Sequence, residues 1–372
     1  MTFKCNGNYI KEYKEFTNLV LTRYGKSAQA TDRETMYLAS KGNLVAQKEY
    51  ADLIFYNKII VSNRFDTAFN LYLKAADITM DNNGLPVCGE GGNPQAFAML
   101  GYYFYNYKRS GFLKNCEDIN ALIAFNDSSL YSRIRYALIF SVSCLQYEKI
   151  PSAINLIGRI LDEASTDKEL FDFLCSDIKE LIEESDFKDT KSFPGSISNQ
   201  DDCADASNYF YEAAAKEGYA YACNNLASRE ADIIAALCLK MIEEGVSEFD
   251  VTHNIGSEIS EHIDKYTDYL KMSAARFESY ASNKLGLFYA CGEIKSSKYD
   301  KTFNFREYSN SSLAKDYFIN ATVYPCKSSA WAYYNLIKRY PKDYNSNIDL
   351  LNEHMECIKR LDPQVYDLAM ED

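Results

Sequence analysis

The sequence has little glycine and proline, with 16 and 7 residues among 372. This excludes collagen-like and low-complexity chains, which need far more of both. Long apolar runs are also missing, because none approaches the length of about 18 residues that a membrane-spanning helix requires. The N-terminal segment MTFKCNGNYIKEYKEF has no basic region followed by an apolar stretch, so no signal peptide is expected. These absences predict a cytoplasmic protein that is not embedded in a membrane.

Positive charge is in short supply. The chain has 40 basic and 53 acidic residues, and its net charge is −13. Such a charge argues against nucleic acid and against an anionic membrane surface as partners. Apolar residues reach 47%, which excludes disorder as the main state. If the protein binds a protein or a peptide, its charge favours a basic one. The sequence leaves the oligomeric state open.

Cysteine pairs with the spacing of a metal site are absent. The eleven cysteines are an odd number, and no two of them form a CxxC motif. Their spacing fits neither a zinc site nor a regular set of disulfides. We expect buried, reduced thiols in an intracellular protein.

Motifs that would indicate catalysis are scarce, and the chain has only three histidines. The segment HNIGSEISEH could suggest a metal site, but it is not an HExxH motif, and a solvated helix face is the favoured explanation. The segment CGEGGNP could hold a phosphate ahead of a helix, yet no lysine follows at the required spacing. We therefore assign no catalytic residue, no cofactor and no metal ligand. A hydrolase with a thiol or carboxylate site stays an open alternative.

The apolar residues follow a helical period along nearly the whole chain. In one segment Leu170, Leu174 and Ile178 recur every four residues, which places them on one helix face. No proline falls inside a strongly periodic segment. The pattern predicts an all-α protein with about 16–18 helices and essentially no sheet. A loop rich in Ser, Gly and Asn predicts a boundary at 187–200, between an N-terminal region (1–186) and a C-terminal region (201–372).

A short pattern of small and large residues recurs five times. Each copy has an alanine, a large apolar residue four positions later and, in most copies, a small residue directly after that. Glycines precede several copies, and alanine pairs stand further upstream. Small residues let neighbouring helices approach closely, and one helix pair cannot bury its own apolar face, so pairs must stack. The residues expected at these contacts are Gly42, Ala46, Ala96, Leu100, Gly101, Gly218, Ala222, Leu226, Ala274, Ala275, Ala281, Leu285, Gly286, Tyr289, Ala332 and Leu336.

These copies resemble the Sel-one-like repeat family, which is related to the tetratricopeptide repeats. The resemblance covers about 38–106 and 204–340. The alanines are 50, 126, 59 and 51 residues apart, against a family period of about 36–44. The fourth copy has Glu278 in place of the glycine, and the fifth has Ile337 in the small position. Residues 107–200 show no clear copy and could hold degenerate repeats.

The resemblance implies a right-handed superhelical solenoid of stacked antiparallel helix pairs. It also implies a non-enzymatic scaffold that holds a protein or peptide partner. A narrower alternative is an immunity protein that neutralises a basic toxin. A structural role in a homo-oligomer is a further alternative.

Aromatic residues are abundant, with 31 Tyr and 21 Phe beside a single Trp. Two clusters place aromatics at consecutive positions, which a helix cannot bury on one face. One interpretation is packing between repeats. The other is a surface that binds a partner, since Tyr and Trp are favoured there. The candidate binding residues are Tyr102, Tyr103, Tyr105, Trp331, Tyr333 and Tyr334.

Overall fold

The computed structural model describes residues 32–80, 86–88, 92–106, 130–145, 148–183 and 197–371. Within these ranges the chain forms 17 α-helices, one short 3₁₀ helix and two small hairpins. The prediction of a predominantly helical protein is confirmed. No helix in these ranges is long and apolar enough to cross a membrane.

Contacts between Cα atoms divide the chain into two compact units, Met1–Ala214 and Ala215–Asp372. The boundary falls inside helix α10 (Gln200–Lys216). Most of the linker expected at 187–200 lies outside the described residues, so that linker stays a prediction.

Helices of the first unit pack in the order of the sequence. Helix α2 packs on α3, α3 on α4, α4 on α5, α5 on α7, and α7 on α8 and α9. A short antiparallel hairpin of β1 and β2 joins α4 to α5. The elements are α2 (Asp32–Ser40), α3 (Leu44–Phe55), α4 (Arg64–Ala75), β1 (Ile78–Met80), β2 (Pro86–Cys88), α5 (Pro94–Asn106), α7 (Leu130–Leu145), α8 (Pro151–Thr166) and α9 (Lys168–Glu183).

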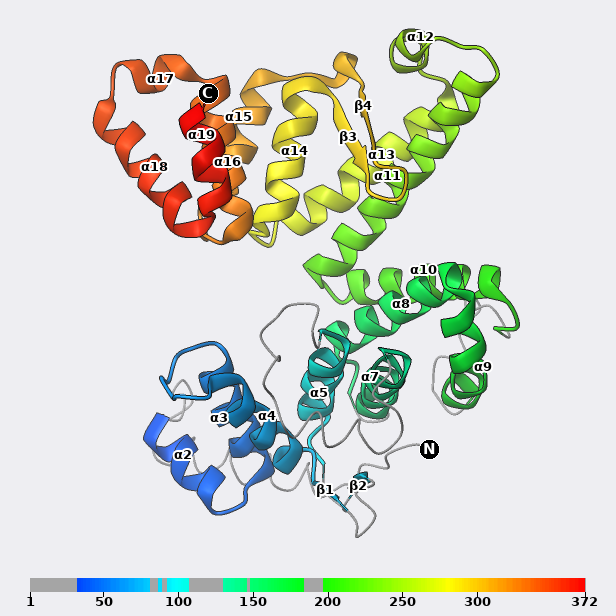
Figure 1. The fold of residues 1–372 in the computed structure, drawn as a ribbon, viewed down its shortest axis with the longest axis vertical. Coiled ribbons are helices and arrows are strands. Elements are labelled where there is room, and N and C mark those ends of the chain that lie inside the picture. Colours follow the sequence, from blue (N-terminus) through cyan, green and yellow to red (C-terminus); the bar gives the residue numbers. More distant parts are fainter. Residues whose placement is uncertain are drawn as a thin grey trace. The chain divides into compact units, whose positions relative to one another are not determined.

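The second unit follows the same order, with short elements inserted between its main helices. Helix α11 packs on α13, α13 on α14, and α14 on α15 and α16, while α18 and α19 pack on α16 (Figure 1). The elements are α11 (Ala220–Glu243), α12 (Glu248–His253), α13 (Ser257–Ala274), α14 (Ser279–Cys291), β3 (Glu293–Ser296), β4 (Lys301–Asn304), the 3₁₀ helix η2 (Arg306–Tyr308), α15 (Ser311–Asn320), α16 (Lys327–Arg339), α17 (Pro341–Asn345), α18 (Ile348–Leu361) and α19 (Pro363–Glu371).

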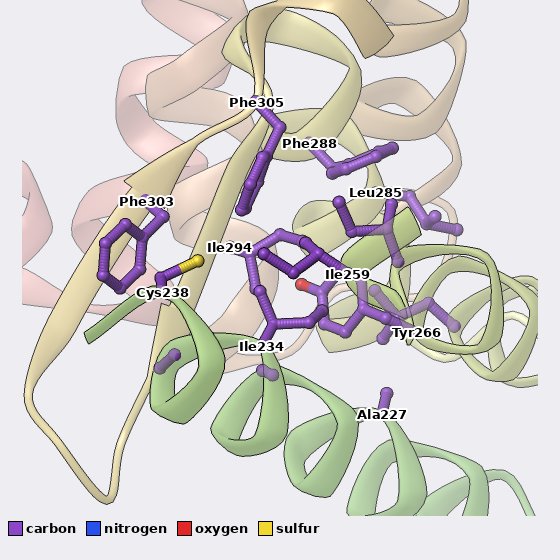
Figure 2. Close-up of a cluster of buried hydrophobic side chains, with 14 of the residues drawn as sticks. Ala227, Ile234, Cys238, Ile259, Tyr266, Leu285, Phe288, Ile294, Phe303 and Phe305 are labelled. Carbon is purple, nitrogen blue, oxygen red and sulfur yellow. The ribbon is translucent and has the colours of Figure 1, made fainter. Parts of the chain in front are cut away.

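The main core of the second unit lies between α11, α13, α14 and the β3–β4 hairpin. Figure 2 shows side chains from all four converging on one cluster. Ile294 of β3 and Phe303 of β4 are buried in it. The hairpin is an element that the sequence analysis missed, because strands of four residues are too short to show a clear alternating pattern. It extends the core along α11.

Most of the residues expected at helix contacts are buried. Four are not: Gly42 and Ala275 are exposed, Gly218 is half-buried, and the half-buried Tyr289 stacks on Tyr317 at 5.6 Å between ring centroids. Burial of the other predicted residues removes their apolar surface from water and favours close packing of the helices. The buried members are Ala46, Ala96, Leu100, Gly101, Ala222, Leu226, Ala274, Ala281, Leu285, Gly286, Ala332 and Leu336.

The glycines at these contacts have two different roles. A Cβ on Gly101 would lie 2.7 Å from the Ser141 hydroxyl oxygen on α7, so glycine permits α5 and α7 to approach. A Cβ on Gly286 would likewise lie 2.5 Å from the Phe318 ring on α15. By contrast, Gly42 and Gly218 adopt left-handed conformations with φ of 87° and 85° in the turns before α3 and α11. Glycine reaches that region without steric cost.

Candidate interaction surface

In the first unit, the predicted aromatic cluster lies mostly in the core. Tyr103 is buried and donates a hydrogen bond to the Phe65 carbonyl oxygen at 3.1 Å. Tyr105 is buried too, and its hydroxyl bonds to the Glu163 carboxylate. Only Tyr102 keeps an exposed ring. The expectation that Tyr103 and Tyr105 face a partner is wrong for this structure, because α4, α7 and α8 all pack on α5 and cover most of its circumference.

In the second unit, the predicted cluster is divided between core and surface. Tyr333 is buried beside Ile358, and this corrects the expectation that it belongs to a binding surface. Trp331 keeps 43% of its surface exposed. The half-buried Tyr334 meets Trp331 edge-on, with 5.9 Å between ring centroids. The surface part of this cluster is therefore the Trp331 side of α16.

We call the alanine that begins each copy of the recurring pattern the motif alanine. An exposed aromatic residue stands directly before the motif alanine in three helices of the second unit. These residues are Tyr221 on α11, Tyr280 on α14 and Trp331 on α16, with exposed fractions of 58%, 43% and 43%. Consecutive helix residues point about 100° apart. A residue next to a buried alanine is therefore turned away from the contact that the alanine makes. Sequence reasoning missed Tyr221 and Tyr280, although their constant offset from the alanine was a usable signal.

The ends of these three helices are joined by side-chain hydrogen bonds. Asn224 of α11 donates to the Glu278 carboxylate at 3.1 Å, and Glu278 caps α14 by accepting from the Ala281 amide at 2.7 Å. The Ser329 hydroxyl of α16 donates to the Ser279 hydroxyl at 3.3 Å. The starts of α11, α14 and α16 are thus linked in a row by these bonds, and each of the three helices carries one of the exposed aromatics near its start.

Two further aromatics extend this row into the turns. Phe277 precedes α14 and Tyr324 precedes α16, and their rings meet edge-on with 5.3 Å between centroids. Both rings are more than half exposed. We define the aromatic strip as Tyr221, Phe277, Tyr280, Tyr324 and Trp331.

Phe277 adopts a backbone conformation that is costly for a bulky residue. Its φ is 58°, and it stands four residues before Ala281, as Gly42 and Gly218 stand before their alanines. Phe277, and not Glu278 as the sequence suggested, therefore takes the position of the glycine. Left-handed backbone costs a non-glycine residue about 1–2 kcal/mol. Retaining an exposed phenylalanine at such a position costs stability without adding core packing. Strain of this kind gathers at functional sites.

Basic side chains flank the aromatic strip. The Lys284 ammonium lies over the Tyr280 ring, 5.7 Å from its centroid. Burial lowers the pKa of Lys284, because it removes water from the charged form. On α16 the Arg339 guanidinium donates to the Asn335 side-chain oxygen at 3.1 Å, and Asn335 in turn donates to the Trp331 carbonyl oxygen. These bonds hold Arg339 on the same helix face as Trp331.

The matching positions of the first unit carry no aromatic residue. Val45 stands before Ala46 and is buried, while Gln95 stands before Ala96 and is half-buried. The aromatic strip is therefore a property of the second unit, although both units share the buried alanines.

The residues that could have suggested catalysis have structural partners. His253 stacks on Phe249, with 3.9 Å between ring centroids. His262 bonds to Glu230 at 2.6 Å, and His354 bonds to the Tyr344 hydroxyl at 2.9 Å. Across the described residues, no three His, Cys, Asp or Glu side chains gather in a way that could hold a metal ion.

Comparison with known proteins returned no relative. No protein-family model matches the chain, and no curated protein matches its sequence. The function of the chain is therefore inferred from its own geometry.

Proposed function

We propose that this chain is a non-enzymatic protein-interaction module that binds a protein or peptide partner along the aromatic strip. The supporting observation is the recurrence of an exposed aromatic directly before the alanine of the recurring pattern in α11, α14 and α16, namely Tyr221, Tyr280 and Trp331. Aromatic side chains bury a large area at a small entropic cost, so they serve as anchors in interfaces. A row of them on neighbouring helices suits an extended partner.

The architecture that we propose is a solenoid of the Sel-one-like type. Helices that pack in sequence order, with small residues at their contacts, support this proposal. In such an array each repeat contacts only its neighbours, so one side of every repeat stays open for a partner. Eight of the cysteines among the described residues are free, which supports a reducing compartment such as the cytoplasm.

Affinity capture from the native cell tests the proposal. The bait is the full chain, compared with a variant that carries Tyr280→Ala and Trp331→Ala. The control variant carries Phe249→Ala and Tyr299→Ala, which removes two exposed aromatics of the same unit outside the aromatic strip. Proteins identified by mass spectrometry are compared among the three baits.

We expect the first variant to lose the partner while the control keeps it. Anchor residues of this kind typically contribute 2 kcal/mol or more to binding, which corresponds to about a 30-fold loss of affinity. Equal capture by all three baits contradicts the proposal. Thermal unfolding provides the folding control, because exposed substitutions change stability by only about 0.5 kcal/mol.

A further inference from the structure

The charge next to the aromatic strip has the opposite sign to the charge of the chain. The three segments that carry the strip, 216–230, 271–284 and 323–339, contain eight basic and three acidic residues, a net charge of +5. The whole of 215–372 contains 18 basic and 24 acidic residues, a net charge of −6. Two of the eight basic residues pair with carboxylates outside these segments, Lys271 with Asp268 at 3.1 Å and Lys327 with Asp362 at 3.6 Å. The positive charge available at the strip therefore depends on the other cations.

Two of the three acidic residues in these segments are engaged within the protein. Glu278 caps α14 and accepts a hydrogen bond from Asn224. Glu230 accepts a short hydrogen bond from His262 at 2.6 Å. Their carboxylates therefore offer little negative charge to a docking partner, and Glu217 remains as the exposed acidic residue of the three segments.

Three cations beside the strip have no ion-pair partner. In the part of the chain that the structure describes, neither Arg276, Lys284 nor Arg339 forms an ion pair. Elsewhere in the unit, by contrast, Lys265 pairs with Glu261 at 2.8 Å and Lys315 with Asp343 at 2.7 Å. A half-buried ammonium such as that of Lys284 loses part of its hydration, and a carboxylate from a partner would offset that loss.

We propose that the aromatic strip binds an acidic peptide segment whose carboxylates pair with Arg276, Lys284 and Arg339 while its apolar side chains pack on Tyr280 and Trp331. This inference rests on the proposed function and specifies the partner's chemistry. It replaces the expectation of a basic partner, which was based on the net charge of −13, with that of an acidic one. The charge within a Debye length of a contact, about 8–10 Å, matters more for association than the charge of the whole chain.

Peptide is favoured over nucleic acid because of the charge beyond the strip. Aromatic rings beside cations can also bind single-stranded nucleic acid by stacking and phosphate contacts. A phosphate backbone carries a charge at every nucleotide, so it would meet the net negative charge of the rest of the unit. A peptide can place a few carboxylates at the three cations and keep neutral residues elsewhere.

The test is a selection of random peptides displayed on phage against the immobilised full chain. Enriched peptides that lack tryptophan are synthesised, and their binding is followed by the fluorescence of Trp331, the single tryptophan of the protein. The charge-reversal variant carries Arg276→Glu and Arg339→Glu. The control carries Lys298→Glu and Lys301→Glu on the β3–β4 hairpin, with the same change in net charge. A second variant, Lys284→Gln, removes one cation without adding a negative charge.

We expect enriched peptides to be acidic, and their affinity to fall at least about tenfold in the charge-reversal variant but not in the control. Lys284→Gln is expected to give a smaller loss in the same direction. Higher salt weakens the interaction, since the pairs lie near the surface. Enrichment of neutral or basic peptides, equal binding by the charge-reversal variant, or no enrichment at all overturns the inference.

Two further measurements distinguish a failure of the acidic-peptide inference from a failure of the proposed function. A variant with Tyr280→Ala and Trp331→Ala has no tryptophan, so its peptide binding is measured by titration calorimetry. Peptides of another charge that bind the parent chain but not this variant overturn the acidic partner and leave the proposed function intact. Peptides that bind without these two residues remove the support for both. A thymidine oligonucleotide is titrated in parallel, and overturns the inference if it binds more tightly than the peptides and is lost in the charge-reversal variant.

Discussion

The two units share their packing residues and differ in the residues beside them. The motif alanines Ala46 and Ala96 of the first unit are as buried as Ala222, Ala281 and Ala332 of the second. One position earlier, the first unit has a buried valine and a half-buried glutamine, while the second has three exposed aromatics. Packing fixes the alanine, because any larger side chain would separate the helices. In the second unit the preceding side chain is largely exposed, so packing does not require an aromatic there, whereas the proposed binding role would account for one.

The largest expected loss of stability comes from disrupting the close helix packing at glycine that the two units share. Gly101→Ala in the first unit and Gly286→Ala in the second should each lower the free energy of unfolding by about 1–3 kcal/mol. Each added methyl would lie within 2.7 Å of a side chain on the neighbouring helix. Chemical denaturation with urea measures the change. If either variant is as stable as the parent chain, close packing at that glycine is not what holds its helices together.

The next prediction compares the stability of variants at the position directly before the motif alanine, which is buried at Val45 in the first unit and exposed at Tyr221 in the second. Val45→Ala should cost about 1 kcal/mol of stability, because it removes buried methyl groups. Tyr221→Ala should leave stability within about 0.5 kcal/mol, because its ring is largely exposed. Denaturation of the two variants measures both changes. A large loss of stability in Tyr221→Ala would make this residue part of the core and remove it from the aromatic strip.

A smaller change in stability is expected at the residue four positions before the motif alanine, where the backbone is left-handed at Gly42 and at Phe277. Gly42→Ala should cost about 1 kcal/mol through the backbone alone, since its new methyl group would meet no atom within 4 Å. Phe277→Gly should leave stability unchanged or higher, because it relieves a φ of 58°. It should also weaken partner binding. Calorimetric unfolding measures the stabilities, and a clear loss in Phe277→Gly would show that this ring supports the fold.

The smallest effect concerns pH and is confined to the second unit. All three histidines lie in 215–372, and burial lowers the pKa of His354 below its usual 6.5. A histidine with a lowered pKa in the folded state binds a proton less readily than in the unfolded state. Its contribution to stability is therefore present above about pH 6.5 and is lost as the pH falls through the lowered folded pKa. His354→Gln should reduce this loss, which thermal unfolding between pH 7 and pH 5 would detect; an identical pH dependence in both proteins contradicts it.

The sequence was sufficient for the helical class and for most of the buried small residues, because both depend on local spacing, but not for Gly42 and Ala275, which are exposed. The burial of Tyr103 and Tyr105 could not be predicted from local spacing. Their burial depends on α4, α7 and α8 packing around α5, and that arrangement is not encoded in the spacing of α5. The β3–β4 hairpin was missed since each strand has only four residues. Tyr221 and Tyr280 were within reach, because their offset from the motif alanine matches that of Trp331.

The most direct test of the account is whether a partner covers Trp331. The chain has one tryptophan, so incorporation of fluorotryptophan gives a single fluorine resonance from the centre of the aromatic strip. We predict that this resonance shifts and broadens when a partner found by capture is added, and that Tyr280→Ala weakens the response. An unchanged resonance in a complex that forms with full affinity would contradict the central claim that this strip is the binding surface.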